Sequence, residues 1–248
     1  MAVRLLTWAE RPDLAGRGPR SEDVWPEYNL HGDVFDAWWG PLEQELPEYQ
    51  FALYDEEADV VLAEAHTGPL VWDGDDATLP PSIDAALEQA VSDRRAGRPV
   101  DTLCAFAAEV DPGVRQRGLS GEVLQGMRTL AARNGLQRLI APVRPSWKER
   151  YPLAPIEDYV TWRREDGQLL DPWMRLHERF GARVAAALPR SLRITGTVAE
   201  WEAWTGLVLP RSGDYVFPHG LAPLTVDREA DAGTYWEPNA WMIHPDVA

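Results

Sequence analysis

The sequence feature that most constrains the fold is the stretch from Glu109 to Gly121, which reads Glu-Val-Asp-Pro-Gly-Val-Arg-Gln-Arg-Gly-Leu-Ser-Gly. An apolar run from Leu103 to Val110 predicts a buried strand. Asp-Pro-Gly at 111–113 ends that strand, because proline fixes φ and glycine allows positive φ. Apolar residues then recur on one helical face from Leu119 to Leu130. A strand, a tight turn and a helix direct backbone N–H groups to one point, which is typical of an anion site.

The charge pattern around this stretch also favours an anionic ligand. The chain carries a net charge of −16, yet residues 112–150 hold eight cationic and two anionic side chains, a net of +6. A cationic segment in an acidic protein attracts a polyanion. We interpret Arg115 and Arg117, which lie in the turn, as ligand contacts, and Arg128, Arg133 and Arg138 as solvated helix-face residues.

Residues 110–120 resemble the acyl-CoA signature of the GNAT superfamily of N-acyltransferases. That signature is a strand ending in Val-x-Pro, followed by Arg/Gln-x-x-Gly-x-Gly/Ala at the start of a helix; Ser120 stands at the last small position. A second landmark, Met174–Arg183, resembles the later helix of the superfamily. It carries His177 where tyrosine is common and Ala182 where phenylalanine is common. The resemblance covers about residues 103–184.

The resemblance implies the fold, the donor and the site residues. We expect one GNAT-like α/β domain over residues 1–248, with a mostly antiparallel mixed sheet of six or seven strands, flanking helices and an elaborated C-terminal region. The strand at 139–143 should separate from the signature strand, with pantetheine in the gap, and Pro142 suits such a place because it cannot complete a ladder. The implied cofactor-binding residues are Val110, Arg115, Gln116, Arg117, Gly118, Leu119 and Ser120.

Direct acyl transfer requires a base for the acceptor ammonium and an acid for the departing thiolate. His177 is the candidate acid, because it occupies the position of the superfamily tyrosine and its helical spacing places it beside Trp173. Its alternative role is a buried core histidine. Glu109 is the first candidate base, and Asp33 and Glu64 are weaker candidates. Strand alternation does not tell whether Glu109 faces the cleft.

The composition excludes several other classes of protein. A net charge of −16 disfavours nucleic-acid and anionic-membrane binding. No apolar run is long enough to span a membrane. A single cysteine, Cys104, rules out disulfides and cysteine-based metal clusters, and the five histidines lack metal-binding spacing, so no metal is expected. We therefore expect a cytoplasmic protein, and the oligomeric state stays open.

The predicted function is transfer of an acetyl or other acyl group from acyl-CoA to the amine of a small molecule. One alternative keeps the fold but takes the acyl group from aminoacyl-tRNA. A second alternative is a non-catalytic domain that binds a small ligand. The segment 144–170 mixes aromatic and cationic residues and is longer than most connections, so it is a candidate wall of the acceptor or acyl pocket; a locally packed surface loop is the other interpretation.

Overall fold

The computed structural model describes residues 3–113, 118–245 and 247. Within them, nine strands form one sheet in the order β1-β2-β3-β4-β5-β9-β8-β7, and β6 pairs with β9. All pairings are antiparallel except that of β4 with β5. The strands are β1 (Val3–Thr7), β2 (Gln50–Asp55), β3 (Val60–Leu70), β4 (Thr102–Val110), β5 (Arg138–Val143), β6 (Arg183–Gly196), β7 (Gly213–Tyr215), β8 (Leu224–Asp227) and β9 (Ala232–Ile243). The expected mixed, mostly antiparallel sheet is confirmed, with more strands than the six or seven predicted.

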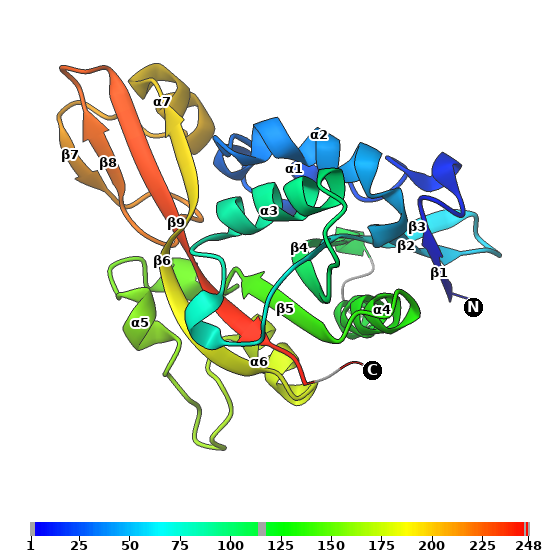
Figure 1. Cartoon of the computed structure of the whole chain (residues 1–248). Coiled ribbons are helices and arrows are strands. Elements are labelled where there is room, and N and C mark those ends of the chain that lie inside the picture. Colours follow the sequence, from blue (N-terminus) through cyan, green and yellow to red (C-terminus); the bar gives the residue numbers. More distant parts are fainter. Residues whose placement is uncertain (1–2, 114–117, 246, 248) are drawn as a thin grey trace.

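Helices cover both faces of the sheet. Figure 1 shows α1, α2 and α3 on one side and α4 and α6 on the other. The helices are α1 (Ser21–Val24), α2 (Phe35–Glu45), α3 (Ile83–Arg95), α4 (Leu119–Arg133), α5 (Ile156–Tyr159), α6 (Pro172–Arg179) and α7 (Val198–Thr205). None of the helices in the described part of the chain is long and apolar enough to cross a bilayer.

Local capping chemistry places several of these helices. Ser82 accepts a hydrogen bond from the Ala85 amide at the start of α3. Asp171 caps α6 by accepting from the amides of Trp173 and Met174, and Thr197 forms a capping box with Glu200 at α7. Such caps satisfy amides that have no partner inside the helix. The sequence predicts all three helix starts, because Ser82 and Asp171 are favoured N-cap residue types and Thr197 is followed by Glu200 in the capping-box pattern.

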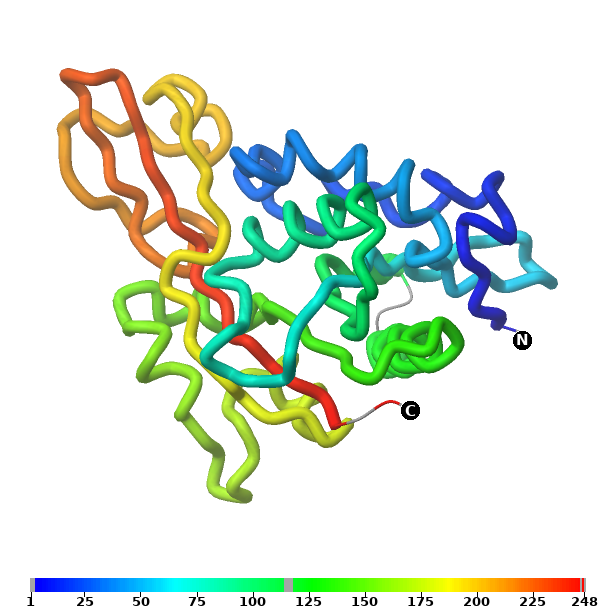
Figure 2. Tube along the Cα trace, viewed as in Figure 1, coloured from blue at the N-terminus to red at the C-terminus, as the bar shows by residue number. Residues whose placement is uncertain are grey.

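The C-terminal region departs most from the prediction. We expected irregular structure with one or two strands after Leu207, whereas β9 is a long central strand between β5 and β6. Figure 2 shows this C-terminal segment in red, running alongside β6. Gly233 and Pro238 interrupt the strand pattern, and the partners of β9 are remote in sequence. Trp241, which is fully buried, anchors β9 in the core.

Two further predictions are corrected. The sequence predicts two separate strands, at 60–65 and 68–72, but the chain forms one strand there, β3, which contains a bulge at His66/Thr67. Asp33 does not cap α2, whose N-cap residue is Val34. Instead, the Asp33 carboxylate accepts hydrogen bonds from the Arg193 side chain and the Thr195 amide, which come from β6.

Candidate active site

A cavity of about 700 Å³ opens where β4 and β5 separate. The two strands pair only from Thr102 to Cys104 on β4 and from Arg138 to Ile140 on β5. Beyond that point, residues 105–110 of β4 and 141–143 of β5 line the cavity. Pro142 pairs with Trp241 of β9 on one side. On the other side β5 no longer pairs with β4, so the missing N–H of the proline breaks no hydrogen bond there. The expected gap between these strands is present.

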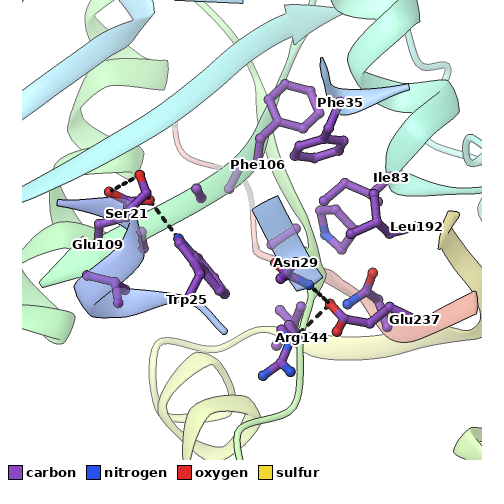
Figure 3. A pocket seen from close by; sticks show the side chains of 18 of the residues that line it. Ser21, Trp25, Asn29, Phe35, Ile83, Phe106, Glu109, Arg144, Leu192 and Glu237 are labelled. Carbon is purple, nitrogen blue, oxygen red and sulfur yellow. Dashed lines mark hydrogen bonds and ion pairs between the residues drawn. The ribbon is translucent and has the colours of Figure 1, made fainter. Parts of the chain in front are cut away.

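The cavity joins the two helical layers of the protein. Trp25, Phe35 and Trp39 line it from the α1–α2 side, and Ser120, Met127 and His177 line it from α4 and α6. Figure 3 shows Phe35, Phe106, Ile83 and Leu192 grouped above two polar ends. One end holds Glu109 and the other holds Glu237. An apolar cavity with a few polar groups is the usual form of a small-molecule site.

Glu109 lies at the first polar end of the cavity. Its side chain therefore faces the cavity, which strand alternation alone did not tell. Its carboxylate is buried and accepts hydrogen bonds from Trp25 Nε1 at 2.6 Å and Ser21 Oγ at 3.1 Å. Burial raises the pKa of Glu109, and the bonds from Trp25 and Ser21 partly oppose that rise. A carboxylate with a raised pKa is suited to accept a proton.

Glu64 faces Glu109 from the neighbouring strand β3. Burial, followed by the charge of Glu109, raises the pKa of Glu64 to about 7. His66 completes the cluster: one ligand-type atom from each of Glu64, His66 and Glu109 lies within 4.8 Å of the other two. These atom types also bind metals. Spacing along the sequence gave no sign of this grouping, because Glu109 comes from a different strand.

His177 lines the cavity from α6, as its helical spacing predicted. Its Nδ1 lies 3.0 Å from Nε2 of His244, and its ring packs edge-on against Trp173. Burial and the adjacent His244 hold the pKa of His177 well below its ordinary value. An acid must carry a proton, but the described partner of His177 is a second histidine, and burial lowers the pKa of this histidine to about 4. His177 is therefore neutral at pH 7.

The second polar end is a network that the sequence did not reveal. Arg144 Nε lies 3.0 Å from Glu237 Oε1, and Asn29 Nδ2 donates to the same oxygen at 3.0 Å. Tyr28 Oη donates to Glu237 Oε2 at 3.3 Å. Glu237 and Asn239 both line the cavity from β9, and their i, i+2 spacing would have placed them on one face had β9 been recognised.

The signature turn is only partly described. Arg115, Gln116 and Arg117 lie outside the described residues. Gly118 caps α4 with a φ of 77°, and Ser120 lines the cavity. Val110 lines it as well, whereas the side chain of Leu119 is buried in the core.

Four described cations of the cationic segment are already engaged by neighbouring groups. Arg138 pairs with Asp101, and Arg144 pairs with Glu237. Lys148 is buried and donates to the carbonyls of Tyr151 and Leu221. Arg128 donates to the carbonyl of Phe180. The net charge of this segment therefore overstated the charge available to a ligand.

Only two residues of the segment 144–170, Arg144 and Ser146, line the cavity. Tyr151, Tyr159 and Trp162 pack against one another with ring centroids 5.1 to 6.0 Å apart. The interpretation as a pocket wall is thus limited to the start of the segment, and the remainder is a packed loop.

Comparison with known proteins fixes the family. No family model matches the chain. The arginine N-acetyltransferase avaD of Aspergillus versicolor is 30% identical over 274 residues, which cover 97% of this chain and 93% of the relative. The chain belongs to the GNAT superfamily of N-acyltransferases. The resemblance seen in the signature is thereby confirmed, and so is the expectation that the protein is an enzyme.

Solved structures support the GNAT fold. The loading GNATL domain of CurA from Lyngbya majuscula aligns with a TM-score of 0.62 at 16% identity, covering 100% of this chain and 98% of that one. The GphF GNAT-like decarboxylase in complex with isobutyryl-CoA aligns with a TM-score of 0.54 at 18% identity, covering 100% of both chains. At these identities the likeness concerns the fold alone.

Proposed function

We propose that this GNAT enzyme transfers an acetyl or other acyl group from acyl-CoA to an amine nitrogen of a small cationic molecule of the arginine class. The observation that carries the proposal is the buried carboxylate of Glu109, placed in a cavity that also reaches the start of α4 between β4 and β5. The named relative, an arginine N-acetyltransferase, supports the acceptor class. The single cysteine, Cys104, is free and buried, which suits a reducing compartment such as the cytoplasm.

The donor would enter from the α4 side. Amides at the start of a helix lack partners within the helix and favour an anion such as the CoA pyrophosphate. Residues 115–120 are the proposed phosphate contacts, and the gap between β4 and β5 would hold the pantetheine arm. The thioester would then lie in the cavity between the elements that carry Glu109 and His177.

Glu109 is the proposed base. It takes one proton from the acceptor ammonium, and the freed lone pair attacks the thioester carbonyl carbon. The C–N bond forms, the C–S bond breaks, and the second proton that the nitrogen loses passes through water to the departing thiolate. The acceptor is cationic, and the carboxylates of Glu43, Glu64 and Glu109 gather on this side, each with a pKa raised by burial. A cation would compensate such buried negative charge.

His177 is the proposed partner of the leaving group. A neutral imidazole donates a hydrogen bond rather than a full proton, so His177 would stabilise the developing thiolate while water protonates it. A hydrogen bond to a charged group is worth about 1.5–3 kcal/mol, so His177→Phe should lower kcat roughly 10- to 150-fold. Affinity for acetyl-CoA, measured by calorimetry, should stay nearly unchanged. A kcat within threefold of the wild type would assign His177 to the core.

The proposed function is tested by incubating the protein with acetyl-CoA and a panel of amines, with free thiol and product mass as readouts. L-arginine and agmatine should be acetylated faster than uncharged amines of similar length. Transfer only from aminoacyl-tRNA would favour the alternative donor. Tight CoA binding without transfer to any amine would favour the non-catalytic alternative.

A further inference from the structure

Three carboxylates lie close to His66, at one side of the cavity. Glu64 on β3 and Glu109 on β4 are register partners, and both are buried. The third, Glu43 on α2, is half-buried; its Oε1 lies 3.7 Å from Nδ1 of His66. Glu109 lines the cavity, and Glu64 lies behind it.

In the described part of the chain, no lysine or arginine forms an ion pair with Glu64 or Glu109. His66 does not compensate them, because burial lowers its pKa to about 4. From α1, the groups that bond to Glu109 are the neutral side chains of Ser21 and Trp25. Glu64 accepts a hydrogen bond from the Gly18 amide, and the charges that act on it are those of Glu109 and Glu43.

Glu64 is also enclosed on its outer side. A Cβ added to Gly18 would lie 2.1 Å from the carboxyl carbon of Glu64, so the backbone packs directly on this carboxylate. Among the described residues, Oε1 of Glu64 has no hydrogen-bond partner, and neither has Nδ1 of His66. A buried polar atom without a partner calls for a role, such as catalysis or an ion.

We propose that Glu64 is a positioning residue for the base: with Glu109 it forms a coupled carboxylate pair that retains one proton between its two members, so that the base is fully ionised only when the pair loses this second proton. This inference rests on the proposed role of Glu109. Two like charges held close together in a buried site cannot both ionise easily, so the second proton is lost at a higher pH. The effect would bring Glu109 closer to the pH at which an ammonium acceptor must lose its proton.

The decisive variant is Glu64→Gln, which keeps the volume of the side chain and removes its charge. Without a partner carboxylate to share that proton, Glu109 ionises in a single step, so the acidic limb of the kcat/KM profile should move to lower pH by about one unit. Glu64→Asp, which keeps the carboxylate, should return the acidic limb part of the way to its wild-type pH. The matched control is Asp84→Asn: Asp84 is buried on α3, and burial raises its pKa to about 6, but it does not line the cavity. In this control the acidic limb of the kcat/KM profile should stay at its wild-type pH.

A second readout does not depend on turnover. The carboxyl carbon of Glu109, labelled with ¹³C and assigned with Glu109→Gln, should titrate at lower pH in Glu64→Gln than in the wild type. This readout separates a failure of the pair from a failure of the proposed acyl transfer. An unchanged Glu109 titration would overturn the proposal, and so would a loss of kcat at every pH without a shift of the limb. A stoichiometric divalent metal that is present in the wild type and lost in Glu64→Gln would overturn it too, because the cluster would then be a metal site.

Discussion

Replacing Glu109 with glutamine is expected to lower kcat by about 10²–10⁴-fold, the usual contribution of a general base. The amide retains the volume of the carboxylate and can still accept hydrogen bonds from Trp25 and Ser21, so the fold should persist. It cannot take a proton from the acceptor ammonium. The loss should shrink as the pH rises, because more of the acceptor is then already deprotonated in solution.

The comparison for this variant is again Asp84→Asn. Asp84 is a buried carboxylate with a raised pKa that accepts a hydrogen bond from the Arg193 amide at 3.0 Å, away from the cavity. Steady-state kinetics should give a kcat close to that of the wild type for Asp84→Asn. Equal losses in the two variants would mean that removing any buried charge disturbs the enzyme, and Glu109 would lose its role as base.

Replacing Gly118 with valine is expected to remove most of the affinity for acyl-CoA. Gly118 has a φ of 77°, which a β-branched residue adopts only with strain. No atom of the described residues lies within 4 Å of the position a Cβ would take there. The valine side chain would fill the place proposed for the pyrophosphate. Losing even one charge-assisted hydrogen bond to a phosphate costs about 1.5–3 kcal/mol, and two would lower the affinity on the order of 100-fold or more.

Gly135, at the opposite end of α4, provides a matched control. Its φ is 68°, and within the described part of the chain no atom lies within 4 Å of its added Cβ. Gly118→Val and Gly135→Val should each cost about 1–2 kcal/mol of stability from the left-handed conformation. Calorimetric titration with acetyl-CoA should show weakened binding only in Gly118→Val. Equal affinity in the two variants would remove the phosphate site from residues 115–120.

Features set by neighbouring residues could be predicted from the sequence. The strand at 103–110, its Asp-Pro-Gly turn and the helix from Leu119 follow from local periodicity and turn chemistry, and the structure contains each described part. The capping residues Ser82, Asp171 and Thr197 act within three residues of their partners. Such signals are complete within a short window of sequence.

Features set by distant partners could not be predicted. The central position of β9 depends on pairing with β5 and β6, about 100 and 50 residues earlier in the chain. Asp33 has a residue type that favours a helix N-cap, yet its carboxylate accepts hydrogen bonds from Arg193 and Thr195 of β6 instead. Arg144 was counted as a free cation, but Glu237 of β9 neutralises it.

The candidate site shows the same division. The helical spacing of His177 placed it correctly beside Trp173, but its ring-nitrogen partner, His244, is 67 residues away. Glu109 was chosen as the base from its position at the end of the strand. Its coupling to Glu64 required the register between β3 and β4. Residue types indicated the chemistry, and only the sheet shows which groups act together.

The most direct test of the account is a crystal structure of the protein with acetyl-CoA and an unreactive analogue of arginine. The account predicts that the pyrophosphate lies at the start of α4 and the pantetheine passes between β4 and β5. The thioester carbon should lie within reach of the acceptor nitrogen, with Glu109 beside that nitrogen. Acetyl-CoA bound outside the gap between β4 and β5, or an acceptor bound away from Glu109, would contradict it.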